Sequence, residues 1–148
     1  RTFSKIYGLA GLRIGYGYGA CELIRVLHQV RPPFNVNSVA LAAALGAIDD
    51  TEFVERSRKA NRDGIAQLYE GFSELGVEYV PSEGNFVLVR FEDSDRVFQY
   101  LYSEGIIVRP LQGYALPEYL RISVGHRDQN QRLLAALSRG LERGLADT

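Results

Sequence analysis

The sequence predicts an α/β protein. After Gly76, segments rich in β-branched and aromatic residues alternate with amphipathic segments of helical period. A long helical pattern over residues 49–75 precedes them. Hydrophobic residues make up 46% of the chain and charged residues 24%, which is typical of a globular protein. Alternating strands and helices favour a sheet with helices on one face.

The first part of the chain predicts one strand and two helices. Residues 12–18 alternate apolar side chains with glycine, which indicates a short buried strand. A helical apolar stripe predicts a helix over 22–30, and a pair of prolines ends it. Asn37 or Ser38 can cap the next helix, an alanine-rich segment over 39–48.

The second part of the chain predicts a long helix followed by a small lobe. Acidic residues at 49 and 50 favour the start of a helix there, because they complement its dipole, and Gly76 ends that helix. We then expect strands over 77–80, 85–91, 106–109 and 119–124, and helices over 93–105 and 127–145. The predicted organisation is therefore a first domain over 1–48, a linking helix over 49–75 and a small domain over 76–148.

Composition excludes several classes of function. The net charge of −1 and the pI of about 6.2 give no support for binding nucleic acid or an anionic membrane. No apolar run approaches the ~20 residues of a membrane-spanning helix. Cys21 is the single cysteine, which suits a reducing, cytoplasmic compartment, and we expect it to be a small buried hydrophobe. His28 has no partner at metal-ligand spacing, so no metal site is expected.

The segment that carries chemistry lies at residues 1–19. Lys5 stands between hydroxyl-bearing residues and a run of glycines, with no acid beside it. Apolar neighbours and the nearby cation Arg13 favour a neutral lysine amine, which can form a Schiff base with an aldehyde. Thr2, Ser4 and Arg13 offer two hydroxyls and a guanidinium to an anion such as phosphate. A lysine near glycines is more commonly a solvated surface residue. The residues around Lys5 must therefore decide between a surface lysine and a Schiff-base lysine.

That pattern resembles a known signature. Ser4-Lys5 followed by Tyr7-Gly8-Leu9-Ala10-Gly11-Leu12-Arg13-Ile14-Gly15-Tyr16 is similar to the Schiff-base lysine segment of fold-type I pyridoxal-phosphate enzymes, above all histidinol-phosphate aminotransferases. The resemblance implies that Lys5 is the catalytic, cofactor-bound lysine and that Thr2, Ser4 and Arg13 bind pyridoxal 5'-phosphate. It covers nearly the whole chain. It implies the tail of the large pyridoxal-phosphate-transferase domain plus the small C-terminal α/β domain of fold-type I aminotransferases.

Two arginines and one asparagine are candidate substrate ligands. Arg121 interrupts an apolar strand, and a guanidinium there needs a paired acid or an anion. A salt bridge is the commoner role, but the nearby Glu118 points the other way in a strand, which leaves room for an external anion. Segments 105–109 and 119–125 resemble those of histidinol-phosphate aminotransferases, which implies that Arg109 and Arg121 bind the anionic end of the substrate. Asn35 is implied near the mouth of the site, although a turn asparagine is the more common role.

The resemblance implies transamination between histidinol phosphate and 2-oxoglutarate, in histidine biosynthesis, by a homodimer. We expect the chain to be a portion of a longer protein and inactive alone, because the family's partners for the cofactor ring lie upstream of the lysine. Aromatic amino-acid aminotransferases and threonine-phosphate decarboxylases share the lysine signature and remain alternatives. A non-catalytic module that retains the fold is the alternative from another class.

Overall fold

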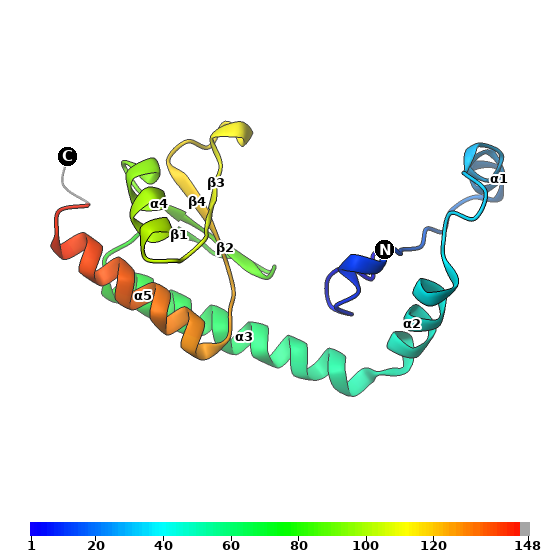
Figure 1. Ribbon diagram of the computed structural model, residues 1–148, viewed down its shortest axis with the longest axis horizontal. Coiled ribbons are helices and arrows are strands. Elements are labelled where there is room, and N and C mark those ends of the chain that lie inside the picture. Colours follow the sequence, from blue (N-terminus) through cyan, green and yellow to red (C-terminus); the bar gives the residue numbers. More distant parts are fainter. Residues whose placement is uncertain (146–148) are drawn as a thin grey trace. The chain divides into compact units, whose positions relative to one another are not determined.

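Figure 1 shows the computed structural model, which describes residues 1–145. The chain divides into two compact units, residues 1–58 and the part that begins at Lys59. This division falls within α3 (Thr51–Glu74). The predicted domain limits after residues 48 and 75 stay a prediction. No helix among the described residues is both long and apolar enough to cross a membrane.

The first unit contains η1 (Ala10–Leu12), α1 (Cys21–Val30), α2 (Ser38–Asp49) and the first turns of α3. Both predicted helices are confirmed. Asn37 is the N-cap of α2, and its side-chain oxygen accepts a hydrogen bond from Ala40 N at 2.8 Å. The predicted start of α3 is also confirmed, since Asp50 Oδ1 accepts from Phe53 N at 2.9 Å in its first turn.

The buried strand predicted over residues 12–18 is wrong. Arg13 adopts a left-handed conformation with φ of 52°, and the segment contributes only an isolated bridge between Gly15 and Thr2. Tyr18 is 86% exposed. A strand needs a neighbouring backbone to pair with its N–H and C=O groups, and residues 1–145 supply little of one here. Cys21 is exposed as well, contrary to the expectation of a buried side chain.

A small core holds the first unit together. Phe3 and Ile14 are buried against Ala40 and Ala44 of α2. Because the two alanines are small, the segment around Lys5 packs directly on the helix. The partly buried residues around this core are Tyr7, Leu9 and Leu12.

The second unit is built on an antiparallel sheet of four strands in the order β1-β2-β4-β3. The strands are β1 (Tyr79–Val80), β2 (Phe86–Arg90), β3 (Arg109–Pro110) and β4 (Tyr119–Ser123). Its other elements are the rest of α3, α4 (Ser94–Ser103), η2 (Gln112–Tyr114) and α5 (Arg127–Glu142). Strands and helices follow one another in the predicted order, with short strands at the edges of the sheet. The strand predicted over 106–109 is largely wrong, since β3 begins only at Arg109.

Helices cover one face of this sheet, as expected from the alternation of elements. The inward side chains of the two central strands are Val87, Val89, Leu120 and Ile122, all at most 1% exposed. They form one core with residues of α3, α4 and α5: Leu68, Phe72, Val97, Leu101, Leu133 and Leu137. Since side chains alternate along a strand, the neighbours of these residues in β2 and β4 lie on the opposite, open face.

The turn between β4 and α5 is fixed to α3. Asn130 is 2% exposed, and its Oδ1 accepts from Gly125 N at 2.9 Å. Its Nδ2 donates to Gln67 Oε1 at 3.2 Å and to Gly64 O at 3.4 Å. The buried Asn130 amide therefore has hydrogen-bond partners both in the turn and on α3. These bonds fix the position of the chain directly after β4.

Candidate functional site

Lys5 lies in a tight turn at the start of the first unit. Ser4 N donates to Thr2 Oγ1 at 3.0 Å, and Gly8 N donates to Lys5 O at 2.9 Å. Gly8 has φ of 69°, a conformation that glycine adopts without strain. The Lys5 side chain is exposed, so residues 1–145 do not provide the desolvation that the sequence suggested.

The segment that contains Arg13 runs beside this turn. Phe3 N donates to Ile14 O at 3.2 Å, and Tyr16 N donates to Arg1 O at 2.9 Å. A side chain at Gly15 would place its Cβ 2.7 Å from Arg1 O, so only glycine allows this close approach. The fold thus brings Thr2, Ser4, Lys5 and Arg13 onto two adjacent stretches of chain, as the motif implied.

The charge of this segment is positive and uncompensated. Among the described residues, neither Lys5 nor Arg13 forms a salt bridge, and Arg13 Nη1 donates only to the carbonyl of Ala10 at 3.0 Å. Two cations and two hydroxyls without an acid are the functional groups that bind a phosphate ester.

The second group of candidate residues lies on the open face of the sheet. Arg109 of β3 and Arg121 of β4 are directly paired in register, and Leu88 of β2 pairs with Arg121 on its other side. Directly opposed residues of an antiparallel pair have Cα atoms about 4.5–5.5 Å apart and side chains on one face. Two like charges in such a pair are destabilising unless an anion or a ring compensates them.

Each of these arginines lies against an aromatic ring. The Cζ of Arg121 is 5.2 Å from the ring centre of Phe86, and its buried Nε has no hydrogen-bond partner among the described residues. The Cζ of Arg109 is 5.6 Å from the ring centre of Tyr114, and its Nη2 donates to Tyr114 Oη at 3.1 Å. The two rings supply part of the stabilisation that an acid would otherwise give.

Sequence reasoning missed both aromatic residues. Phe86 could have been found, because alternation along β2 places it on the face opposite Val87, together with Leu88. Tyr114 belongs to the irregular segment between β3 and β4, where no periodic pattern indicates the direction of a side chain.

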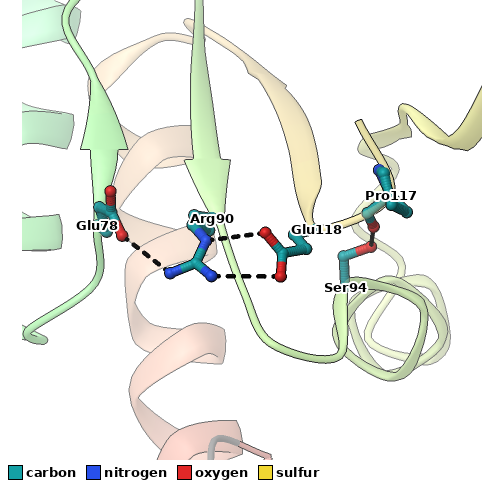
Figure 2. A network of polar contacts seen from close by, with 5 residues as sticks. All are labelled: Glu78, Arg90, Ser94, Pro117 and Glu118. Atoms are coloured by element: carbon teal, nitrogen blue, oxygen red, sulfur yellow. Dashed lines mark hydrogen bonds and ion pairs between the residues drawn. The ribbon is translucent and has the colours of Figure 1, made fainter. Parts of the chain in front are cut away.

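The acid nearest Arg121 in sequence is engaged elsewhere (Figure 2). Glu118 accepts from Arg90 Nε at 3.1 Å and from Arg90 Nη2 at 3.2 Å, and Glu78 accepts from Arg90 Nη1 at 3.3 Å. Hydrogen bonding to Glu118, and then to Glu78, raises the pKa of Arg90 above its ordinary value. The same bond lowers the pKa of the Glu118 carboxyl. Glu118 is therefore occupied by Arg90, which favours an external anion over a salt bridge for Arg121.

Asn35 lies exposed in the connection between α1 and α2, next to Phe34, which is left-handed with φ of 54°. Its role at the mouth of the site stays a prediction. The described residues also contain no group of three or more His, Cys, Asp or Glu side chains that could hold a metal ion.

The model of the family described as aminotransferase class I and II matches residues 1–137. The chain belongs to this family. It is 54% identical over 146 residues to histidinol-phosphate aminotransferase 1 of Cupriavidus pinatubonensis, and 52% identical over 143 residues to histidinol-phosphate aminotransferase 1 of Nitrosococcus oceani. Each match covers 96% of this chain and 39% of the relative, so this aminotransferase chain spans about two fifths of the length of the curated relatives it matches.

Solved aminotransferases share the fold. The histidinol-phosphate aminotransferase of Sinorhizobium meliloti in complex with pyridoxal-5'-phosphate matches with a TM-score of 0.87 at 28% identity, over 97% of this chain and 40% of that one. The L-threonine-O-3-phosphate decarboxylase of Porphyromonas gingivalis matches with a TM-score of 0.81 at 28% identity, over 95% and 45%. The predicted fold, a portion of a fold-type I aminotransferase, is therefore confirmed.

The residues of the first unit fit pyridoxal phosphate. The exposed Lys5 amine is free to reach an aldehyde, and no acid pairs with it among the described residues. Ser4, Thr2 and Arg13 present donors for a phosphate group on the adjacent stretches of chain. The glycine at position 15 keeps the two stretches close together, which holds these donors near the lysine.

Proposed function

We propose that the full-length protein containing this chain catalyses the pyridoxal-phosphate-dependent transamination between histidinol phosphate and 2-oxoglutarate in histidine biosynthesis. The observation that carries this proposal is the pair Arg109 and Arg121, which face each other in register without an acid on a chain that also carries the Lys5 turn. An uncompensated arginine pair suits a substrate that is anionic in both half-reactions, first as a phosphate and then as a carboxylate. The names of the closely related curated proteins support the choice of histidinol phosphate.

The chain's own residues have distinct tasks in this reaction. Ser4, Thr2 and Arg13 would hold the phosphate group of the cofactor, and the Lys5 amine would bind its aldehyde group. When bound, pyridoxal phosphate supplies an electron sink for the negative charge that develops at the substrate Cα. We assign the Lys5 Nζ as the general base that accepts the Cα proton, because an amine nitrogen with a free lone pair can take up a proton.

Arg109 and Arg121 orient the substrate through its anionic end. A guanidinium binds phosphate and carboxylate with the same forked geometry, so one site can serve histidinol phosphate and then glutamate or 2-oxoglutarate. Fixing that end restricts the orientations that the bound substrate can adopt, which is how positioning contributes to rate. Asn35 is proposed at the mouth of the site.

The assembly and the setting belong to the same proposal. We place the enzyme in the cytoplasm, which the single cysteine of this chain favours. We expect a homodimer, and we expect the 148 residues by themselves to be inactive. Appreciable turnover by the isolated chain would contradict the last point.

A single-turnover assay on the full-length protein tests the proposal. The cofactor's absorbance is followed after histidinol phosphate, phenylalanine or threonine phosphate is added separately. Rapid loss of the lysine-bound cofactor band with histidinol phosphate alone is the expected result, and Lys5→Ala should abolish it. A faster response to phenylalanine would move the enzyme to the aromatic class, and release of carbon dioxide from threonine phosphate would make it a decarboxylase. Failure to retain the cofactor at all would favour the non-catalytic module.

A further inference from the structure

We propose that the Tyr114 hydroxyl is a specificity-determining group, a third donor that distinguishes a phosphate from a carboxylate at the arginine pair. This inference rests on the proposed function, because it concerns the site that binds the anionic end of both substrates. Tyr114 lies in η2, on the segment that joins the two arginine-bearing strands β3 and β4. Figure 1 shows this connection between β3 and β4.

The hydrogen bond between Arg109 and Tyr114 leaves the phenolic proton available. Arg109 Nη2 is the donor in this bond and Tyr114 Oη the acceptor, at 3.1 Å. A phenol has one hydrogen to donate, and no described residue accepts it. A hydroxyl that accepts from a cation is polarised and becomes a stronger donor. The Tyr114 hydroxyl can therefore donate a hydrogen bond to an anion that is bound by Arg109.

The two anions differ in how many donors they can use. A phosphate ester presents three terminal oxygens and carries nearly two negative charges at neutral pH. A carboxylate presents two oxygens in one plane and carries one charge. A third oxygen lets the phosphate accept a bond from the Tyr114 hydroxyl while it keeps both arginines as donors, whereas a carboxylate has no third oxygen. Of the two rings that lie against the arginines, that of Tyr114 carries a hydroxyl and that of Phe86 does not.

Tyr114 is also exposed enough for this role. Its side chain is 61% exposed, although its ring lies against the Arg109 guanidinium at 5.6 Å.

The substitution Tyr114→Phe would keep that ring contact and remove only the hydroxyl. It therefore isolates the donor from the cation–π contact. Tyr102→Phe is the matched control, since Tyr102 is 60% exposed on α4 and makes its ring contact with Phe98.

The test measures both anions on the cofactor-loaded full-length protein. Stopped-flow absorbance gives the concentration dependence of the half-reactions with histidinol phosphate and with glutamate. Calorimetry with inorganic phosphate and with acetate gives binding constants that do not depend on turnover. For Tyr114→Phe we expect about tenfold weaker binding of histidinol phosphate and inorganic phosphate, which corresponds to about 1.4 kcal/mol. We expect less than a twofold change for glutamate and acetate, unchanged limiting rates, and no effect of Tyr102→Phe.

Two results would overturn the inference, and they are distinguishable from each other. If Tyr114→Phe weakens phosphate and carboxylate equally, or neither, the hydroxyl does not select between them, while the proposed transamination can stand. The variants Arg109→Gln and Arg121→Gln report on the underlying site. If both leave the binding of every anion unchanged, the arginine pair is not the anion site, and the substrate-binding part of the proposed function fails together with the role of Tyr114.

Discussion

Replacing Gly64 by alanine is expected to destabilise the second unit, although alanine is the better helix former. Gly64 is buried in α3, where the helix passes the turn between β4 and α5. An added Cβ would lie 2.5 Å from Val124 Cγ1, 3.1 Å from Asn130 Nδ2 and 3.2 Å from Gly125 O. Ordinary contacts between carbon atoms are about 3.5–4.0 Å, so Val124 would have to move by about 1 Å.

The magnitude follows from two opposed effects. Overpacking of this kind costs about 1–3 kcal/mol, and the neighbours here yield poorly, because one is a stiff β-branched side chain and another is backbone. Disturbing the Asn130 hydrogen bonds adds about 1 kcal/mol. Alanine in place of glycine in a helix returns about 1 kcal/mol. The last two effects cancel, so the net expectation is a loss of about 1–3 kcal/mol in the free energy of unfolding.

Urea unfolding of the chain, followed by tyrosine fluorescence, measures this loss. Six of the nine tyrosines lie beyond residue 58, so the signal reports mainly on the second unit. With a slope of about 2 kcal/mol per molar urea, the midpoint should fall by about 0.5–1.5 M. Ala66→Gly, at an exposed position of the same helix, measures propensity alone and should cost about 1 kcal/mol. If Gly64→Ala raises the midpoint by as much as Ala66→Gly lowers it, the close packing at Gly64 is refuted.

Three further predictions concern a surface pair, a cap and the core. Because Arg90 lowers the folded-state pKa of Glu118, their bond stabilises the fold above the unfolded-state pKa of that carboxyl and is lost as the pH falls through the folded value. Glu118→Gln should therefore melt below the parent at pH 7 and together with it near pH 2; a gap that persists in acid would contradict the assignment. Asn37→Ala should cost about 1 kcal/mol and reduce the helical circular dichroism of α2, whereas Asn37→Asp should not; equal spectra for both would exclude the cap. Leu68→Ala should cost about 2–5 kcal/mol in urea unfolding and Leu68→Met less than about 1.5, since the side chain is fully buried; a cost below 1 kcal/mol for alanine would show that the site is not core.

The sequence by itself located the helices and the candidate site residues. Helical periodicity and capping residues involve positions no more than four apart, so the segments that became α1, α2 and α3 could be located along with the Asn37 cap. The Lys5 motif could likewise be recognised from the sequence, because it consists of neighbouring residues in a particular order. The prediction that Arg121 binds an external anion followed from the cost of a guanidinium on a half-buried strand.

Only the tertiary structure decided what depends on residues distant in sequence. The register that sets Arg109 opposite Arg121, and the choice of Arg90 as the partner of Glu118, depend on which strands pair. The strand predicted over 12–18 did not form, because a strand needs a partner backbone that no local pattern reveals. The direction of the Tyr114 side chain could not be predicted, because Tyr114 lies in a segment without a regular hydrophobic pattern. Local patterns follow from the geometry of a single helix or strand, whereas pairing is selected by the burial of the whole core.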